Sequence, residues 1–300
     1  MRDRSPITRF WSSSRLAGLA LVGSFAVPAT GFLGQGYFGS NVSLVEEQTF
    51  YKDLIVADLP TYGYWRLGET STTTAADTSS AGNTGTYGGG YTQGEVGAFS
   101  YNTDNATRFN GSTSQITTSR SYSNVLTLSA EAWVKTTSTA AGGVLFFSDG
   151  SGFSPNLYMN SSGQFIFYVW NGSGYSINSS LSYNDGNWHH LVGTVGAAGI
   201  QLYIDGALVA SQASPTSNWS GTATWRIGRD TIGGYFSGVI DDVAIYSTQL
   251  SAQKIKNHYR VGKSITGRSC QEILQNSAAT GDGIYLLSPY SNFKTLAYCD

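Results

Sequence analysis

Short apolar runs separated by turn-forming clusters fill the sequence after residue 62. The clusters are rich in Gly, Asn, Asp and Ser, and 37 of the 300 residues are glycine. Because each cluster ends one extended run and begins the next, this spacing predicts an all-β sandwich or barrel. The clearest strands are expected at residues 64–67, 106–109, 126–135, 143–148, 156–159, 164–170, 188–195, 200–204, 207–211, 225–228 and 236–246.

Two of these runs indicate which strand faces are buried. Every second residue from Leu126 to Val134 is aliphatic, and Glu131 and Lys135 fall on the opposite face. This period of two predicts a half-buried strand. In residues 164–170 both faces are apolar, which predicts a central strand that is covered on both sides.

Turn and cap residues give two further local predictions. Asp205-Gly206 lies between two apolar runs and predicts a two-residue hairpin with a type I′ turn. Ser251 can cap a short helix in which Ile255 and Tyr259, one turn apart, face the body of the domain. The expected layout is therefore many strands followed by one short helix.

Composition excludes several classes of protein. Charged residues make up 12% of the chain, against about 25% in an average soluble protein. Aromatic residues make up 13% and the net charge is −2, which is the opposite of a disordered chain. A coiled coil needs far more charged residues, and a nucleic-acid partner needs a basic surface. We therefore expect a folded domain that does not bind nucleic acid.

The N-terminal segment has the layout of a secretory signal. Four arginines precede an uncharged stretch at residues 16–27, and small residues follow as far as Ala29. This pattern predicts a signal peptide at residues 1–29, with an uncleaved membrane anchor as the alternative. Residues 30–56 are expected to be a spacer with one short helix. The protein is therefore expected to be secreted or displayed at the cell surface, with no other membrane contact.

A set of motifs runs in one order through residues 57–262 and resembles a known family. The set resembles laminin-G-like (LamG) domains of the concanavalin A-like lectin/glucanase superfamily. The resemblance implies an all-β fold, a two-sheet antiparallel jelly-roll sandwich whose first and last strands lie side by side. The matching segments are Tyr64–Glu69, Ala106–Gly111, Ser129–Val134, Asp185–Val192, Leu202–Gly206 and Phe236–Tyr246.

A second resemblance covers residues 263–300. Segments 268–274, 281–285 and 297–300 look like the first part of fibrinogen-like domains, whose larger part has no counterpart here. The resemblance implies a disulfide between Cys270 and Cys299, which would make a small disulfide-linked C-terminal unit. Either this unit is complete, or the sequence belongs to a longer protein, which we favour.

Catalytic signals are weak although the superfamily includes glycan-cleaving enzymes. Retaining glycosidases need two carboxyl groups about 5–5.5 Å apart. The related glucanases use a Glu-x-Asp-x-x-Glu strand, which is missing here. Asp241 and Asp242 are adjacent and should face opposite ways, and Glu131 stands alone on its strand. We therefore expect a protein that is not an enzyme.

Calcium is the cofactor that the resemblance suggests, since many relatives carry this ion. Hard cations need several oxygen ligands. Asp77 and Asp241 are the expected ligands, because the pairing of the first and last strands would bring their regions together. The alternative is that Asp77 caps a turn and Asp241 is a satisfied buried residue.

Carbohydrate binding would use aromatic side chains beside glycine-rich loops. The candidates are Trp170, Tyr175, Trp219 and Tyr235, although each could instead serve packing. We expect a non-catalytic binding module whose partner is a carbohydrate or an extracellular protein. The alternatives are the targeting region of a larger extracellular enzyme and a structural spacer of a surface protein.

Overall fold

The computed structural model describes residues 50–149, 153–263, 266–267, 270–275, 282–290 and 293–299. The predicted signal or anchor at residues 1–29 lies outside the described residues, as does the spacer up to residue 49. The remaining spacer residues contribute helix α1, Phe50–Ala57.

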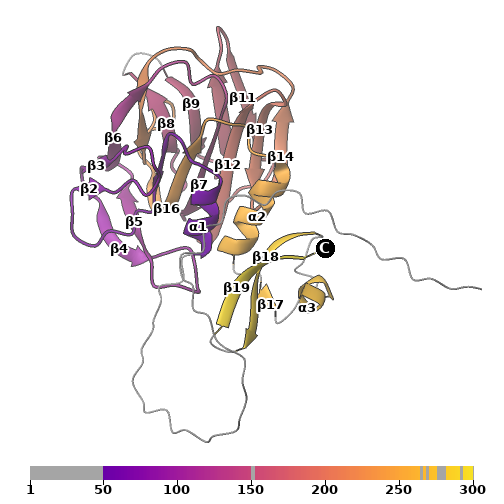
Figure 1. Ribbon diagram of the computed structural model, residues 1–300. Helices are drawn as coiled ribbons and strands as arrows, with labels where there is room; N and C mark the ends of the chain where they lie inside the picture. The colour runs from indigo at the N-terminus through magenta and orange to yellow at the C-terminus, as the bar shows by residue number, and fades with distance from the viewer. Residues whose placement is uncertain are drawn as a thin grey trace, which may run out of the picture. The chain divides into compact units, whose positions relative to one another are not determined.

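Two antiparallel sheets of eight strands each form the described part of the sandwich (Figure 1). Sheet A runs in the order β14 (Ala207–Gln212), β13 (Gly199–Ile204), β12 (Trp188–Gly196), β7 (Leu128–Lys135), β16 (Ser237–Tyr246), β5 (Asn105–Asn110) and β4 (Thr92–Val96), and β1 (Gly63–Trp65) also pairs with β16. Sheet B runs in the order β11 (Gly174–Asn178), β10 (Phe165–Trp170), β9 (Phe153–Met159), β8 (Gly142–Ser148), β15 (Ala223–Ile227), β6 (Gln115–Tyr122), β3 (Gly85–Gly88) and β2 (Thr74–Ala75).

The predicted fold class is confirmed. All eleven runs singled out from the sequence contain strands. The pairing of Tyr64 with Ala244 places the first strand beside the last strand of the sandwich. The hairpin at Asp205-Gly206 has positive φ at both residues, 53° and 75°, as a type I′ turn requires. Strands β2, β3, β4, β6 and β11 were not predicted, because their Thr, Ser and Gly residues give no apolar run.

The main core fills the space between the two sheets. Phe165, Phe167 and Val169 of β10 point into it and are fully buried. Trp225 of β15 packs against Phe147 of β8 in the same core, with the two ring centroids 4.5 Å apart. Aromatic side chains of this size bury roughly 150–250 Å² each, so they supply much of the apolar area that stabilises the sandwich.

Two helices cover the outer face of sheet A, as the indigo and orange ribbons show (Figure 1). Tyr51 and Ile55 of α1 and Ile255 of α2 (Ala252–Gly262) pack with Trp133 of β7 in a second apolar cluster. Strand β7 is thus buried on both faces, and the prediction of a half-buried strand was wrong because the sequence does not show which strands the helices cover. Ser251 caps α2 as predicted, its hydroxyl accepting from the Lys254 amide. Among the described residues, none of the helices is long and apolar enough to span a membrane.

A buried charged network joins these helices to sheet A. His258 of α2 contacts the carboxylates of Glu131 and Asp58, each at 2.9 Å. His190 of β12 contacts Glu131 at 3.1 Å, and the Tyr246 hydroxyl donates to the same carboxylate. Glu131, His190 and His258 are all fully buried, which closes them to a substrate and gives the network a structural role.

In this network, opposite charges shift the pKa values of Glu131 and His258 more than burial does. Burial alone would lower the pKa of His258, but Glu131 and Asp58 raise it to about 9. Burial likewise raises the pKa of Glu131, yet His258 and His190 hold it well below its usual range. Glu131 and His258 are therefore both charged at neutral pH.

The C-terminal residues form a small sheet with its own disulfide. It contains β17 (Thr266–Gly267), β18 (Gly283–Tyr290) and β19 (Phe293–Cys299), beside helix α3 (Cys270–Gln275). Cys270 and Cys299 are joined, as the second resemblance implied. The unit contacts α2, where buried Arg260 donates to the Asp282 carbonyl at 2.8 Å and stacks over Tyr285.

Candidate functional site

Strand β10 leaves aromatic side chains on the outer face of sheet B. Ile166 and Tyr168 are half-buried there, and Trp170 is 41% exposed. The prediction of a central, doubly covered strand was wrong, because β10 lies next to the edge strand β11 and the helices α1 and α2 cover sheet A instead. Apolar side chains on an uncovered face are costly in water, and a group of them marks a binding surface.

Four strands build one row of side chains across this face. Arg226 of β15 pairs with Phe146 of β8, which pairs with Asn156 of β9, which pairs with Tyr168 of β10. Directly paired residues share a face of the sheet. In the next row Tyr158 of β9 pairs with Ile166. Phe146 and Asn156 are covered. The face therefore presents the partly exposed side chains of its two rows, which include two tyrosine rings and one guanidinium.

The amide of Asn156 has unused hydrogen-bonding capacity. Asn156 is 0% exposed, yet neither its Oδ1 nor its Nδ2 has a hydrogen-bond partner among the described residues. A buried polar group without a partner costs about 1–3 kcal/mol. Because the residue is fully covered, its amide lies beneath the face and lowers stability without contacting a ligand on the surface.

The loop at residues 228–236 closes one end of the face. Asp230 accepts from the Ile232 and Gly234 amides through Oδ1, while its buried Oδ2 has no partner. Burial raises the pKa of Asp230 to about 6. Beside it, Arg229 lies over the ring of Tyr235 at 5.0 Å. This end adds a second cation and a second unused acceptor.

The structure separates the four aromatic residues predicted from sequence. Trp170 and Tyr235 border the outer face of sheet B at its two ends. Tyr175 pairs with inward-facing Val169 and packs against the core. Trp219 packs against the core at 6.4 Å from Phe147. Two of the four thus flank the row described above, and two lie against the core.

Asn156, Tyr158 and Arg226 are residues that the sequence did not single out. The runs at 156–159 and 225–228 were predicted as strands, but no sequence signal shows which strands pair with them. One sequence signal indicates this face, because Tyr168 and Trp170 alternate with the inward-facing residues of β10. From sequence alone, these two aromatic residues are interpreted as buried.

Both carboxylate oxygens of Asp77 accept hydrogen bonds from backbone amides. Its Oδ1 accepts from the Tyr64 and Ser79 amides at 2.9 Å, and its Oδ2 accepts from the Asn83 amide at 2.6 Å. These bonds tie the loop after β1 to that strand. The carboxylate therefore serves as a turn cap.

Asp241 has a different environment. Its Oδ2 accepts from the Ala98 amide at 2.8 Å, while Oδ1 is buried without a partner. The neighbouring Asp242 accepts from the Tyr64 hydroxyl and also has one buried, unpaired oxygen. Burial and the charge of Asp242 raise the pKa of Asp241 well above its usual range, and Asp104 lies close enough to raise it further.

The two adjacent acids interact, against the sequence prediction that they face opposite ways. A bulge interrupts the pairing between Asp241 and Ala244, and Asp242 has a positive φ of 46°. This irregularity turns both carboxylates to the outer side of sheet A. Because both are buried, neither can reach a substrate.

Two further findings limit the chemistry of the described residues. Within them, no group of three or more His, Cys, Asp or Glu side chains has a metal-binding arrangement. His189 contacts Asp205 at 2.8 Å and Asp185 at 3.1 Å, and the amide of His190 donates to Asp205. These contacts fix the β13–β14 hairpin, so the histidine pair is structural.

Comparison with known proteins identifies the sandwich. Residues 109–256 match the family described as the concanavalin A-like lectin/glucanases superfamily (Laminin_G_3). No curated protein matches the sequence. One similar solved structure is domain 4 of AbnA, a GH43 extracellular arabinanase from Geobacillus stearothermophilus, in complex with arabinotriose. It is 18% identical to this chain with a TM-score of 0.53. The match covers 66% of this chain and 97% of that domain.

A second solved structure has the same fold. The receptor binding domain of botulinum neurotoxin type G is 16% identical with a TM-score of 0.51. The match covers 66% of this chain and 50% of that one, so this chain spans about half of its length. At these identities the likeness shows the fold alone. Residues 109–256 of this sandwich match the laminin-G-like model of the concanavalin A-like lectin/glucanase superfamily.

Proposed function

We propose that this domain is a non-catalytic module that binds carbohydrate through the outer face of sheet B. The observation that carries the proposal is the group of partly exposed side chains on that face, Tyr158, Ile166, Tyr168 and Trp170, with Arg226 in the same row as Tyr168. Aromatic rings can stack on the C–H faces of a sugar, and Arg226 can bind its hydroxyl groups. A solved domain of the same fold was crystallised with arabinotriose, which supports this ligand class.

A glycan array with matched variants tests the proposal. Tyr168→Ala removes a ring from the centre of the face, and Trp170→Ala removes the exposed ring at its end. Tyr298→Ala is the control, because Tyr298 is 61% exposed on β19 and lies outside the sandwich. We expect wild type and the control to bind the same glycans, and both face variants to lose at least about tenfold in affinity.

Two results would count against this function. Wild-type protein that binds no glycan would remove carbohydrate as the partner and favour an extracellular protein instead. Glycan binding that survives in Tyr168→Ala and Trp170→Ala at wild-type affinity would place the site elsewhere. Folding of each variant is checked by its thermal unfolding, so that loss of binding is not confused with loss of structure.

We also propose that calcium binds at Asp241 and not at Asp77. The unpaired carboxylate oxygens of Asp241 and Asp242 suit a hard cation, and Asp104 adds negative charge nearby. The ion would neutralise a buried acidic pair and hold β16 against the loop at Ala98. Its role would be structural, since the pair lies on sheet A and the sugar site on sheet B.

Chelation tests the calcium proposal directly. We expect 1–2 mM CaCl₂, which is about one to twenty times a Kd of 10⁻⁴–10⁻³ M, to raise the melting temperature of chelator-treated protein. Asp241→Asn should abolish this rise, whereas Asp77→Asn should leave it. A melting temperature that does not respond to calcium would show that the acidic pair shares a proton instead of binding an ion.

We also propose an extracellular location, which the Cys270–Cys299 disulfide supports because such bonds persist in oxidising compartments.

The second candidate function is that of a targeting region within a larger extracellular enzyme, since the arabinanase domain with the same fold is one part of such an enzyme. The fibrinogen-like resemblance of residues 263–300 is part of this second candidate. Reading the gene downstream of Asp300 separates the two, because an immediate stop codon removes the second.

A further inference from the structure

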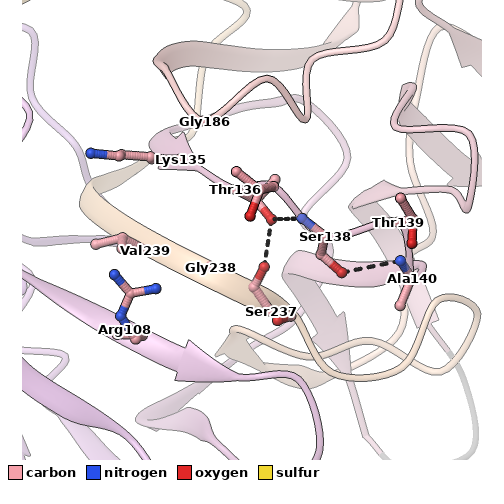
Figure 2. A pocket seen from close by; sticks show the side chains of 11 residues that line it. Arg108, Lys135, Thr136, Ser138, Thr139, Ala140, Gly186, Ser237, Gly238 and Val239 are labelled. Carbon is pink, nitrogen blue, oxygen red and sulfur yellow. Dashed lines mark hydrogen bonds between the residues drawn. The ribbon is translucent and has the colours of Figure 1, made fainter.

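A pocket of about 490 Å³ opens at one end of sheet A, away from the proposed sugar face (Figure 2). It lies where β5, β7 and β16 meet the loop that follows Lys135. Ile240 points into the core between the sheets, so the adjacent Val239 lies on the opposite, outer side. The volume falls within the roughly 300–1,000 Å³ typical of small-molecule sites.

Two cations lie on the same row of the sheet at this pocket. Lys135 and Arg108 both pair with Val239, one from each side, so the three residues share the outer face. Figure 2 shows the two cations on one side of the pocket and Ser138, Thr139 and Ala140 on the other.

The charge of the pocket is not fully balanced. Arg108 forms two hydrogen bonds with Glu95, at 2.6 and 3.1 Å. Lys135 forms no ion pair with any described residue, and its Nζ lies 6.0 Å from the ring centroid of Trp188. Two cations and one carboxylate leave one net positive charge at the site.

Hydroxyl groups supply the remaining polar lining. Thr136 accepts from the Ser138 amide and donates to the Ser237 carbonyl, which fixes the loop. The Thr137 and Thr139 hydroxyls are exposed and form no hydrogen bond with the described protein. These groups match the hydroxyls of a sugar ring.

We propose that this pocket binds a sugar that carries an anionic group, either a carboxylate or a sulfate ester. The anion pairs with Lys135, and the ring hydroxyls bond to Thr137 and Thr139. The site lies on sheet A, so it acts separately from the outer face of sheet B. A domain with both sites would hold two positions of one acidic glycan or two different chains.

Titration with three small sugars tests the proposal on the full chain. The probes are galactose as the neutral reference, galacturonic acid as the carboxylate and galactose 6-sulfate as the sulfate ester. We expect at least one acidic sugar to bind about tenfold or more tightly than galactose, with an affinity that falls as salt rises. The preferred acidic sugar identifies the anionic group.

Variants assign the binding to this pocket. Lys135→Gln should weaken the acidic sugar about tenfold, and Thr139→Val should weaken all three sugars. Lys263→Gln, a change at another exposed lysine, should have no effect. Equal affinity for galactose and both acidic sugars, no binding of any probe, or unchanged binding by Lys135→Gln would overturn the proposal.

Discussion

Asn156 is the residue at which a single change is expected to stabilise the protein. Its buried amide has no partner among the described residues, which lowers stability. Leucine has a similar size and no polar atoms. Asn156→Leu should therefore raise the free energy of unfolding by about 1 kcal/mol and leave glycan binding unchanged, because the covered amide does not contact the ligand. Denaturant unfolding and a titration with the strongest array glycan measure the two effects.

Asn156→Asp serves as the opposite control. It keeps the size of the side chain but buries a charge, so it should lower the free energy of unfolding at neutral pH. A leucine variant that is destabilised as much as the aspartate variant would show that the amide is satisfied in the free protein. The stability cost assigned to this amide would then be wrong.

His258 sets the expected pH dependence of stability. Its pKa is raised from about 6.5 in the unfolded chain to about 9 in the folded one. This contribution is fully present below about pH 6.5 and is lost as the pH rises toward 9, by about 3 kcal/mol in total. The pKa of Glu131 is lowered, so its contribution is present above about pH 4.3 and is lost on acidification.

Unfolding free energies measured between pH 5 and 9 check this expectation. Stability should decline through the upper half of that range in wild type. His258→Gln should be less stable at pH 6 and should decline less between pH 6.5 and 9. A wild-type profile that is flat or rises above pH 6.5 would contradict the assignment of the charged network to His258.

At the scale of elements, α1 is part of the sandwich although it lies in the sequence region expected to be a spacer. Its residues Tyr51 and Ile55 are 1% and 0% exposed against sheet A. Ile55→Ala should lower the free energy of unfolding by about 2–5 kcal/mol, as for other buried aliphatic residues. Thermal or denaturant unfolding measures this. The neighbouring exposed Val56→Ala is the matched control and should cost less than about 0.5 kcal/mol.

Elements specified by neighbouring residues were predicted well, and those specified by distant ones were not. The Asp205-Gly206 hairpin and the Ser251 cap depend on a few adjacent residues, and both were confirmed. The pairing of β10 with β9 and β11, and the covering of β7 by the helices, depend on contacts between distant segments. A sequence pattern shows that a face is apolar but not what covers it.

The candidate site could be predicted from the sequence less completely than the elements could. Trp170 and Tyr235 could be proposed from sequence because they are aromatic and lie near glycine-rich loops. Asn156 could not, since its importance comes from burial without a partner, which only the assembled sheet creates. Asp242 was expected to face away from Asp241, and a single bulge reversed that expectation.

At the scale of the whole molecule, the sandwich and the disulfide-linked unit should unfold separately. The disulfide closes a loop of 29 positions, which contributes roughly 3–4 kcal/mol on the chain-entropy model. The sandwich core contains neither cysteine. Reduction should therefore increase hydrogen exchange in β18 and β19 while β7, β12 and β16 keep their protection. Equal loss of protection in all five strands would show that the two parts unfold together.

The central claim is that the outer face of sheet B holds the glycan. The most direct measurement is the change in backbone amide chemical shifts when the strongest array glycan is added to labelled protein. The account predicts that the largest shifts fall at Phe146, Asn156, Tyr158, Tyr168 and Arg226. Shifts confined to residues around α1 and α2, or no shifts at a saturating glycan concentration, would contradict it.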